Sequence, residues 1–550
     1  MVPARRVLLT ALACALAACG APVKPGTGDG LPPVTVPVNA RGDWTNGAVV
    51  YELFVRSFQD SNGDGKGDLK GLISRLDYLN DGDPSTTHDL GVDAIWMMPI
   101  FESPSYHGYD TTNYELIEPD YGTNADFQTL VTEAHKRGIK LVLDFVMNHT
   151  SSEHPWFNES ASSTASARRD WYVWNASNPG WKQPWGGNYP TWALRNGSYY
   201  YGVFWSGMPD LNYRNAAVKA EMKRLASLWL SRGADGFRLD AARYLVENGA
   251  GSLQQDQAET HRYWKEWAAH VRAEKPDALI VGEVWADTTT ISSYYGSSAT
   301  IPGGDELPLN LNFPLASEII KGVKNGEATG IAGQLKVTHA VYAPGATDAP
   351  FLTNHDMKRV MTELGDSVGK AKNAAAITLT VPGTAFLYYG EELGAQNGTA
   401  SNDESKRTPM AWDSSTNGGF STASPWYAFA PGKTSANVAN QTNDPDSILS
   451  RYRKLIRARK ASAALSRGGL QIFTPTAGSS NTLVFVRVLG DERVLVAHNL
   501  TDGYATAGPF KLAQENTEPL FADEGASLSG GPGAWNLSLP PRGTGIWRIQ

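Results

Sequence analysis

Short apolar runs alternate with longer amphipathic stretches through the middle of the chain. The runs are continuously apolar, as expected of strands in a parallel sheet that is buried on both faces; they cover Ala48–Val55, Ala94–Met98, Lys140–Val146, Gly236–Leu239, Leu279–Val284, Leu307–Phe313, Pro350–Thr353 and Thr384–Tyr389. The helix-like stretches between them include Asp126–Arg137, Ala216–Ser231, Gln257–Ala273 and Lys370–Leu379. This alternation predicts an α/β fold, a (β/α)8 TIM barrel. An open doubly wound sheet is the alternative, but its usual Gly-rich phosphate-binding turn after an early strand is missing from the sequence.

Two regions depart from the alternation. Roughly 60 residues follow the third strand before the next helix, and a structureless loop of that length is improbable in a compact domain. The region is rich in aromatic residues, namely Trp156, Trp171, Trp174, Trp181, Trp185, Trp192 and Tyr199–Tyr201. We therefore expect a small inserted domain over residues 149–208, within a barrel that spans residues 42–465. From Leu470 onward short alternating runs predict a C-terminal antiparallel β-sandwich, over residues 466–550.

The N-terminus has the organisation of an export signal. Two arginines precede an apolar run that ends at Ala18 and is too short to span a bilayer. The sequence LAACG follows the pattern of the bacterial lipoprotein cleavage box, in which the cysteine, here Cys19, becomes the lipidated first residue. We expect a signal peptide over residues 1–18, then a lipidated, flexible tether over residues 19–41. An ordinary secretory signal cut nearby is the alternative, and both interpretations export the protein, either anchored to the bacterial cell envelope or cell surface or released outside the cell.

Composition narrows the classes of function. The chain is 41% hydrophobic and 19% charged, as in ordinary globular proteins. A net charge of −8 and a pI near 5.8 argue against a nucleic-acid partner, which needs a basic face. The only cysteines are Cys14, inside the expected signal, and Cys19, so no disulfide is expected. We expect a monomer that touches a membrane only through its N-terminal lipid.

Polar clusters end several of the expected strands. The segments that carry them are Leu141–Thr150, Met208–Asn212, Gly233–Leu245, Ile280–Trp285 and Phe351–Asp356. A barrel places its active site at the C-terminal ends of its strands. A single aspartate at a strand end is often only a helix cap or a solvated charge. Several carboxylates that converge on one mouth would repel each other unless a function uses them. Histidines and an arginine are expected at the same mouth.

Three of these carboxylates, Asp240, Glu283 and Asp356, suit the hydrolysis of a glycosidic bond. That reaction uses one carboxyl group to protonate the leaving oxygen and another to attack or to activate water. Arg238 lies two residues before Asp240, so both side chains face the same side of a strand, and its charge would keep Asp240 ionised. Apolar neighbours would raise the pKa of Glu283 so that it is protonated before reaction. Asp356 would then stabilise the positively charged sugar of the transition state.

The same segments resemble the sequence regions of the α-amylase family of glycoside hydrolases (family thirteen), in order and in spacing. Two further stretches agree, GVDAIWMMPI followed by HGYDTTNY, and GTAFLYYGEELG, so the resemblance extends from about Gly42 to the C-terminus. It implies a retaining mechanism with Asp240 as nucleophile, Glu283 as acid/base and Asp356 as stabiliser. It also implies that Tyr109 stacks on the sugar at the cleavage subsite, where the other binding residues are Asp110, His149, Arg238 and His355.

A second site is suggested upstream by the sequence DSNGDGKGD. It presents oxygen ligands at alternating positions, like the first part of an EF-hand loop, although Gly71 stands where the bidentate glutamate should be. An Asx-rich surface turn is the alternative. The resemblance to α-amylase relatives implies structural calcium (Ca2+), held by positions matching Asp60, Asn62, Asp64, the Lys66 carbonyl and Asp68. Tyr244 replaces the histidine of a different calcium site found in many amylases, which puts a second calcium ion in doubt.

Substrate preference has weaker signals. The string MPDLN is similar to that of an intermediate subgroup that includes exported bacterial α-amylases, and Ala241 stands where relatives that cut α-1,6 bonds often carry valine. Both features favour an endo-acting α-1,4-glucan hydrolase, an α-amylase acting on starch or maltodextrins. One alternative is an α-glucosidase, oligo-1,6-glucosidase or transglycosylase that uses short oligosaccharides. Another is a non-catalytic carbohydrate-binding relative, against which the intact acid trio argues.

Overall fold

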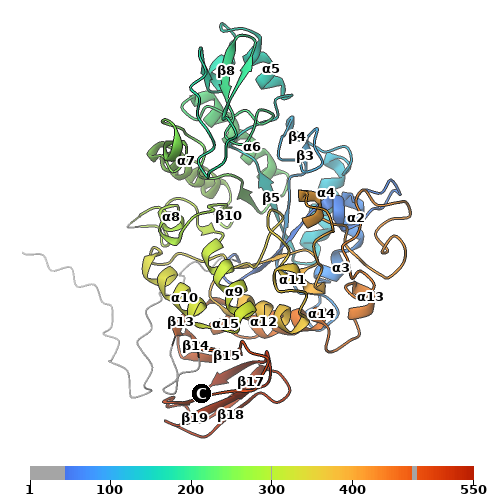
Figure 1. Cartoon of the computed structure of the whole chain (residues 1–550), viewed down its shortest axis with the longest axis vertical. Helices are drawn as coiled ribbons and strands as arrows, with labels where there is room; N and C mark the ends of the chain where they lie inside the picture. The colour runs from blue at the N-terminus through green and yellow to red at the C-terminus, as the bar shows by residue number, and fades with distance from the viewer. Residues whose placement is uncertain (1–43, 299, 473–479) are drawn as a thin grey trace, which may run out of the picture.

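The computed structural model describes residues 44–298, 300–472 and 480–550 (Figure 1). The expected signal peptide, Cys19 and the tether lie outside the described residues. Within the described part of the chain, no helix is both long enough and apolar enough to cross a membrane.

A curled parallel sheet forms the centre of the molecule. Its strands, in spatial order, are β11 (Leu309–Asn310), β10 (Leu279–Gly282), β9 (Gly236–Leu239), β5 (Lys140–Phe145), β2 (Ala94–Met97), β1 (Val49–Leu53) and β12 (Ala385–Tyr388). The gap between β11 and β12 is closed by residues 348–350. Ala349 forms a parallel bridge with Leu311, and the Phe386 N–H donates to the Pro350 carbonyl at 2.9 Å. The predicted (β/α)8 barrel is therefore confirmed.

One expected strand is replaced by an irregular segment. No strand is assigned to Pro350–Thr353, and the pairing with the neighbouring strands is made at Ala349 and Pro350. Proline has no N–H to donate to a ladder. The strand expected over Leu307–Phe313 is also short, since α9 already begins at Phe313. Both differences lie on the side of the barrel where the sheet closes.

Helices surround the barrel and return the chain to the start of each strand. The main ones are α4 (Asn124–Lys136), α6 (Ala216–Ser231), α7 (Ala258–Glu274), α9 (Phe313–Asn325), α10 (Thr329–Val341), α12 (Val368–Thr380) and α14 (Ile448–Lys460). Shorter helices are α1 (Val55–Phe58), α2 (Leu69–Ser74), α3 (Leu76–Leu79), α8 (Thr288–Ser293), α11 (Val360–Glu363), α13 (Val438–Gln441) and α15 (Ala463–Arg467). Side-chain caps fix several starts: Thr123 and Asp126 form a capping box on α4, and Asn215 caps α6.

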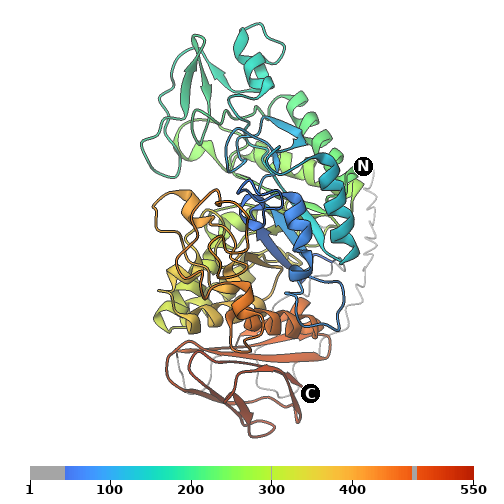
Figure 2. The same ribbon diagram turned by 90° about the vertical axis from the view of Figure 1, so that its right-hand side faces the viewer.

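The region after β5 folds into a small unit above the barrel (Figures 1 and 2). It contains α5 (Pro155–Ser162) and a sheet of β6 (Trp174–Asn175), β8 (Ser198–Tyr201) and β7 (Trp192–Arg195). Trp192, Tyr201 and Val203 form a separate apolar cluster within it. A hairpin of β3 (Phe101–Glu102) and β4 (Asn113–Ile117) lies beside it. The position of the inserted unit, at a strand's C-terminal end, places it over the mouth of the barrel.

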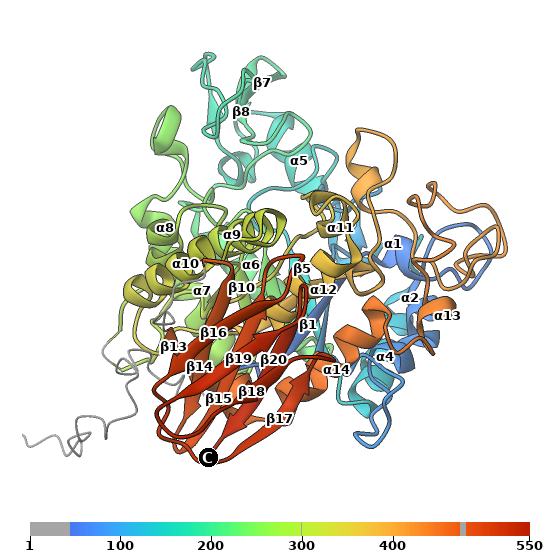
Figure 3. The same ribbon diagram turned by 60° about the horizontal axis from the view of Figure 1, so that its bottom comes forward.

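The C-terminal region is a β-sandwich (Figure 3). One antiparallel sheet contains β13 (Gly469–Ile472), β14 (Thr482–Leu489), β15 (Glu492–Asn499), β20 (Thr544–Ile549) and β17 (Thr517–Ala522), and the other contains β16 (Ala505–Phe510), β19 (Trp535–Leu539) and β18 (Ser527–Ser529). Side chains from both sheets share one core, including Leu495 and Trp547 from the first and Phe510 and Leu537 from the second. The predicted sandwich is confirmed.

Candidate active site

Arg238 lies at the centre of the predicted site, fully buried at the C-terminal end of β9. Its Nη1 lies 2.9 Å from Asp144 Oδ1 and 2.8 Å from Asp240 Oδ1, and its Nη2 lies 2.9 Å from Glu283 Oε2. Because β5, β9 and β10 are neighbours in the sheet, their ends bring these three carboxylates to one guanidinium. Two members of the predicted trio, Asp240 and Glu283, are thus joined through one buried cation.

Burial governs the protonation of these two acids. It raises the pKa of Asp240 to about 6, because the opposing effect of Arg238 is partly cancelled by Asp144 and Asp356. Burial likewise raises the pKa of Glu283 above its usual range, although Arg238 again opposes it. Arg238 therefore acts on Asp240 in the predicted direction but does not hold its pKa at the value of a free aspartate.

The residue that follows Asp240 has an unusual backbone conformation. Ala241 has φ +52°, in the left-handed region that only a few per cent of non-glycine residues adopt. In this conformation its N–H donates to Glu283 Oε2 at 3.0 Å. The turn therefore fixes the carboxyl group of Glu283 directly beside the residue that follows Asp240.

Asp356, the third acid, is held by two cations. His355 Nε2 lies 3.2 Å from its Oδ2 and Arg407 Nη2 lies 2.9 Å from its Oδ1. Burial alone would raise the pKa of Asp356, but these two cations outweigh burial and hold the pKa far below its usual range. With 36% of its side chain exposed, Asp356 presents a permanent negative charge to the mouth of the barrel.

Tyr109 and His355 stack face to face, with ring centroids 5.3 Å apart and planes 14° apart. The Tyr109 hydroxyl lies 3.0 Å from Asp144 Oδ2 and 2.6 Å from His355 Nε2. Glu52, on β1, accepts from His355 Nδ1 at 2.6 Å. Burial lowers the pKa of His355, yet Asp356 and Glu52 outweigh it and raise the pKa to about 9. His355 is therefore a cation at neutral pH.

The remaining predicted binding residues, His149 and Asp110, flank Tyr109. His149 is 1% exposed, and its Nε2 donates to the Tyr109 carbonyl at 3.1 Å. Burial lowers the pKa of His149 to about 3, so the ring is neutral. Asp110 accepts hydrogen bonds from Ser103, at 2.8 Å, and from Ser105. The structure thus places Tyr109, His149, Arg238 and His355 in one connected group, with Asp110 bonded within its own loop.

Three residues of this neighbourhood were not identified from the sequence. Glu52 and Arg407 position His355 and Asp356 as described above. Trp285, two residues after Glu283, is 49% exposed, and its ring lies parallel to Phe313 with centroids 4.7 Å apart. The sequence carries a signal for two of them: a glutamate inside the otherwise apolar strand YELF, and a tryptophan two residues after a catalytic candidate. Arg407 gave none, because it lies in a long segment without periodic pattern.

In the loop from Asp60 to Asp68, backbone N–H groups donate hydrogen bonds to side-chain oxygens of the same loop. The N–H of Asn62 donates to Asp60 at 2.9 Å, that of Asp64 to Asn62 at 2.9 Å, and that of Lys66 to Asp64 at 2.8 Å. Its carboxylate, amide and carbonyl oxygens are the donors that calcium prefers. Within residues 44–298, 300–472 and 480–550, no three His, Cys, Asp or Glu side chains are grouped so that they could hold a metal ion. The carboxylates would therefore have to turn toward an ion to bind it.

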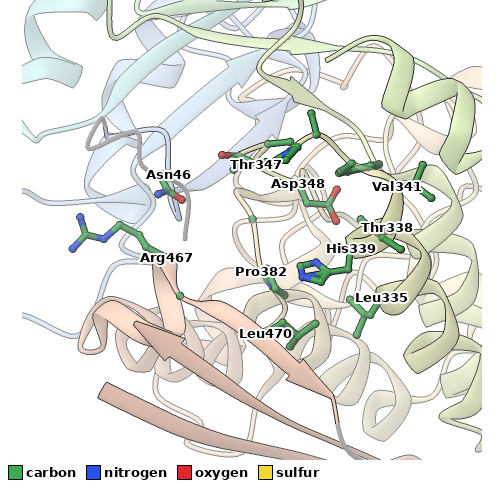
Figure 4. A pocket seen from close by; sticks show the side chains of 18 residues that line it. Asn46, Leu335, Thr338, His339, Val341, Thr347, Asp348, Pro382, Arg467 and Leu470 are labelled. Atoms are coloured by element: carbon green, nitrogen blue, oxygen red, sulfur yellow. The ribbon is translucent and has the colours of Figure 1, made fainter. Parts of the chain in front are cut away.

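A cavity of about 470 Å³ lies at the other end of the barrel, against the C-terminal sandwich (Figure 4). Asn46 and Arg467 lie on one side of it, and His339 and Asp348 lie on the other. Asp348 begins the segment that closes the barrel, and the lining residues Asn46 and Gly383 precede β1 and β12, so this cavity is at the N-terminal ends of the strands. It is therefore remote from the three acids.

A (β/α)8 barrel with paired carboxyl groups at the C-terminal ends of its strands is an architecture that suits glycoside hydrolysis. The family model described as alpha amylase, catalytic domain, matches residues 52–468. The chain accordingly belongs to the α-amylase family of glycoside hydrolases.

Similar proteins are named both as amylases and as glucosidases. The chain is 40% identical to alpha-amylase 3 of Dictyoglomus thermophilum, over 83% of this chain and 85% of the relative. It is 33% identical to probable oligo-1,6-glucosidase 2 of Bacillus subtilis, over 84% of this chain and 91% of the relative. The crystal structure of alpha-amylase from H. orenii has a TM-score of 0.82 at 37% identity, and covers 92% of this chain and 100% of that one.

Proposed function

We propose that the protein is a retaining, endo-acting α-1,4-glucan hydrolase that acts on starch or maltodextrins. The observation that carries the proposal is the joining of Asp240 and Glu283 through Arg238, with the ionised Asp356 at the same mouth. Paired carboxyl groups of this kind are what glycosidic bond hydrolysis requires.

Each acid has a separate role in this proposal. Asp240 attacks the anomeric carbon while Glu283 protonates the departing glycosidic oxygen; water then enters with Glu283 as base, and the glycosyl ester on Asp240 is hydrolysed. A pKa of about 6 leaves most Asp240 ionised at pH 7, while the raised pKa of Glu283 favours the protonated acid. Asp356, kept ionised by its two cations, stabilises the positive charge that develops on the sugar.

Sugar binding at the cleavage subsite is assigned to residues around Tyr109. The Tyr109 ring provides an apolar face for a pyranose, and its stacking on His355 keeps that face in place. The buried Arg238 and His149 fix the positions of Asp240 and of the Tyr109 backbone. Asp110 is assigned to the same subsite by the family pattern.

An endo-acting enzyme needs contacts with sugars on both sides of the bond that is cut. Trp285 supports this assignment, because a half-exposed indole stacked on Phe313 lies two residues from Glu283, the acid that protonates the leaving group. The similarity to an alpha-amylase at 40% identity points the same way. The similarity to an oligo-1,6-glucosidase keeps an α-glucosidase acting on short substrates as the second candidate.

The proposal is tested by product profiles over time on starch, maltotriose, pullulan, isomaltose and sucrose. Early release of oligosaccharides of many lengths from starch supports the amylase; glucose released from short substrates alone supports the glucosidase. Asp240→Ala and Glu283→Gln should abolish hydrolysis while leaving the melting temperature near that of the wild type. Undiminished turnover in Asp240→Ala would overturn the mechanism.

We also propose that the Asp60–Asp68 loop binds one structural calcium ion. The chemistry of its oxygen donors supports this, with Asp60, Asn62, Asp64, the Lys66 carbonyl and Asp68 as the ligands. An ion there would tie two buried aspartates, Asp60 and Asp68, to the exposed part of the loop.

Export as a lipoprotein completes the proposal. The apolar N-terminal run and the LAACG sequence support cleavage before Cys19, lipidation of that residue, and anchoring to the bacterial cell envelope. Cys19→Ala should release the protein from the membrane fraction of expressing bacteria. A variant that still sediments with membranes would show that lipid is not the anchor.

A further inference from the structure

Trp185, in the inserted unit above the barrel, exposes a large part of its indole to solvent. It is 47% exposed, whereas Trp192 of the same unit is 6% exposed and lies in its core. Trp185 lies within a tight turn and is followed by Gly186 and Gly187, which have φ +89° and +128°. These conformations favour glycine, so the backbone directs the chain away just after the tryptophan.

The turn that carries Trp185 is anchored at both of its ends. Lys182 and Pro190 form an antiparallel bridge across its base. Gln254 Nε2 donates to the Lys182 carbonyl at 2.7 Å, and Gln183 Nε2 donates to the Phe204 carbonyl at 2.6 Å. The exposed indole is therefore held by an ordered support, which reduces the conformational entropy lost when a ligand binds to it.

Aromatic rings continue from Trp185 to the catalytic mouth. Its ring packs on Phe204 with centroids 5.4 Å apart, and on the edge of Tyr244 at 5.4 Å. Phe204 in turn contacts His149 at 5.2 Å. Tyr244 lies four residues after Asp240, just beyond the turn that follows β9. Trp185, Phe204 and Tyr244 thus form an aromatic strip. One end of the strip, Phe204, borders the cleavage subsite through His149, and the other end is the exposed ring of Trp185.

Tyr244 also connects this strip to the side of the site where Glu283 lies. Its neighbour Arg243 forms an ion pair with Asp256 at 2.5 Å and donates to the Trp285 carbonyl at 2.7 Å. The Arg243–Tyr244 pair therefore contacts both tryptophans, Trp185 through the ring of Tyr244 and Trp285 through its backbone carbonyl. Since Glu283 is the acid that protonates the leaving group, this part of the mouth faces the leaving-group half of a bound chain.

We propose that Trp185 forms a glucan-binding subsite, on which a glucose ring of the leaving-group side stacks. The ligand class is a neutral α-glucan chain long enough to reach beyond the cleavage subsite. The inference rests on the proposed glucan hydrolase and deepens it, because it makes preference for long chains a property of the inserted unit. An aromatic face suits the C–H side of a pyranose ring, and the charge of Arg243, which precedes Tyr244, is paired with Asp256.

The experiment compares Trp185→Ala, Trp185→Phe and wild type on maltoheptaose and soluble starch, and on maltotriose. Trp185→Ala should lose about tenfold in kcat/KM on the two long substrates and stay within about twofold on maltotriose. Trp185→Phe should recover most of the loss. Leu194→Ala is the matched control, because Leu194 is 61% exposed on the same inserted unit, and it should leave all three values unchanged.

A binding measurement separates the subsite from the chemistry. In the Glu283→Gln background, Trp185→Ala should reduce retardation of the protein in an amylopectin gel, while Leu194→Ala should not. Equal losses on maltotriose and starch, or undiminished kcat/KM on starch, would overturn the subsite. If the wild type cuts no α-1,4-glucan, the proposed function fails; undiminished gel retardation of the Trp185→Ala double variant overturns the subsite independently of that result.

Discussion

Replacing Arg407 by methionine should weaken catalysis while the barrel remains folded. Arg407 is 4% exposed; its Nη2 lies 2.9 Å from Asp356 Oδ1, and its Nε donates to the His355 carbonyl at 3.1 Å. Methionine keeps the apolar stem and removes the charge. Asp356 retains His355 at 3.2 Å and stays ionised, but it loses the contact that fixes its carboxylate toward the sugar.

The size of the effect follows from these contacts. A hydrogen bond to a charged group contributes about 1.5–3 kcal/mol. Because 36% of the Asp356 side chain is exposed, water screens part of the pair. A value of about 2 kcal/mol in the transition state corresponds to about a thirtyfold loss in kcat/KM. The Tyr106 hydroxyl and the His355 carbonyl also lose a donor, which costs about 1–3 kcal/mol of unfolding free energy.

Initial rates of reducing-end release on soluble starch measure kcat and KM, and thermal melting followed by circular dichroism measures folding. Arg407→Lys should recover part of the rate, because lysine restores the charge without the fork geometry. Tyr106→Phe is the matched control: it removes one partner of Arg407, the hydroxyl 3.0 Å from Nη1, and leaves Asp356 untouched. A folded Arg407→Met variant with kcat/KM within about threefold of wild type would refute the role of Arg407.

The other predictions concern pH, the backbone turn and the metal loop. The kcat/KM should fall as the pH drops through about 6, because protonated Asp240 cannot attack the sugar; an acid limb near the pKa of free aspartate would contradict the effect of burial. Ala241→Val should lower the unfolding free energy by about 1–2 kcal/mol in urea denaturation, because a branched side chain is strained at φ +52°, whereas Ala241→Gly should not. Removal of calcium by a chelator should lower the melting temperature. If the calcium concentration had been about a hundredfold above its Kd, the loss is equivalent to about 3 kcal/mol of unfolding free energy, and Asp64→Ala should remove the difference between the two conditions. An unchanged melting curve counts against calcium.

The acids could be found from the sequence because their positions follow from a simple rule. Parallel strands end on one side of a barrel, so polar residues directly after apolar runs meet there. Asp240 and Glu283 follow β9 and β10, which are neighbours in the sheet. The pairing of Arg238 with Asp240 required only the alternation of side chains along a strand, whereas its contact with Glu283 appears only in the structure.

Other parts of the site depend on contacts between distant segments. Arg407 reaches Asp356 across 51 residues of chain that contain short helices and irregular loops. The pKa of Asp240 depends on how completely the surrounding domain excludes water, which neighbouring residues in the sequence do not specify. The irregular segment after Pro350 likewise reflects a local conflict, since an apolar run of strand type contains a residue that cannot donate to the ladder.

The metal loop is attached to the segment that follows Arg407. The Asp60 N–H donates to the Phe420 carbonyl at 3.0 Å, and the Ser421 hydroxyl donates to Asp60 Oδ2 at 2.5 Å. The Trp426 N–H donates to the Gly65 carbonyl at 2.8 Å. The hydroxyl of Ser421 and the loop N–H groups also lower the pKa of Asp60, against the effect of burial. These hydrogen bonds therefore couple the conformation of the loop to the positions of residues 420–426.

From Trp426 the contacts continue to the third acid. Its ring stacks on Tyr106, with centroids 5.5 Å apart and planes 28° apart. The Tyr106 hydroxyl accepts from Arg407, and Arg407 holds Asp356. A change in the conformation of the metal loop can therefore displace Asp356 through the packed rings of Trp426 and Tyr106 and the guanidinium of Arg407. This effect does not require a calcium ion next to the sugar. For this reason a variant of the loop that lowers the rate should do so in the same way as Arg407→Met, by displacing Asp356 and leaving Asp240 and Glu283 in place.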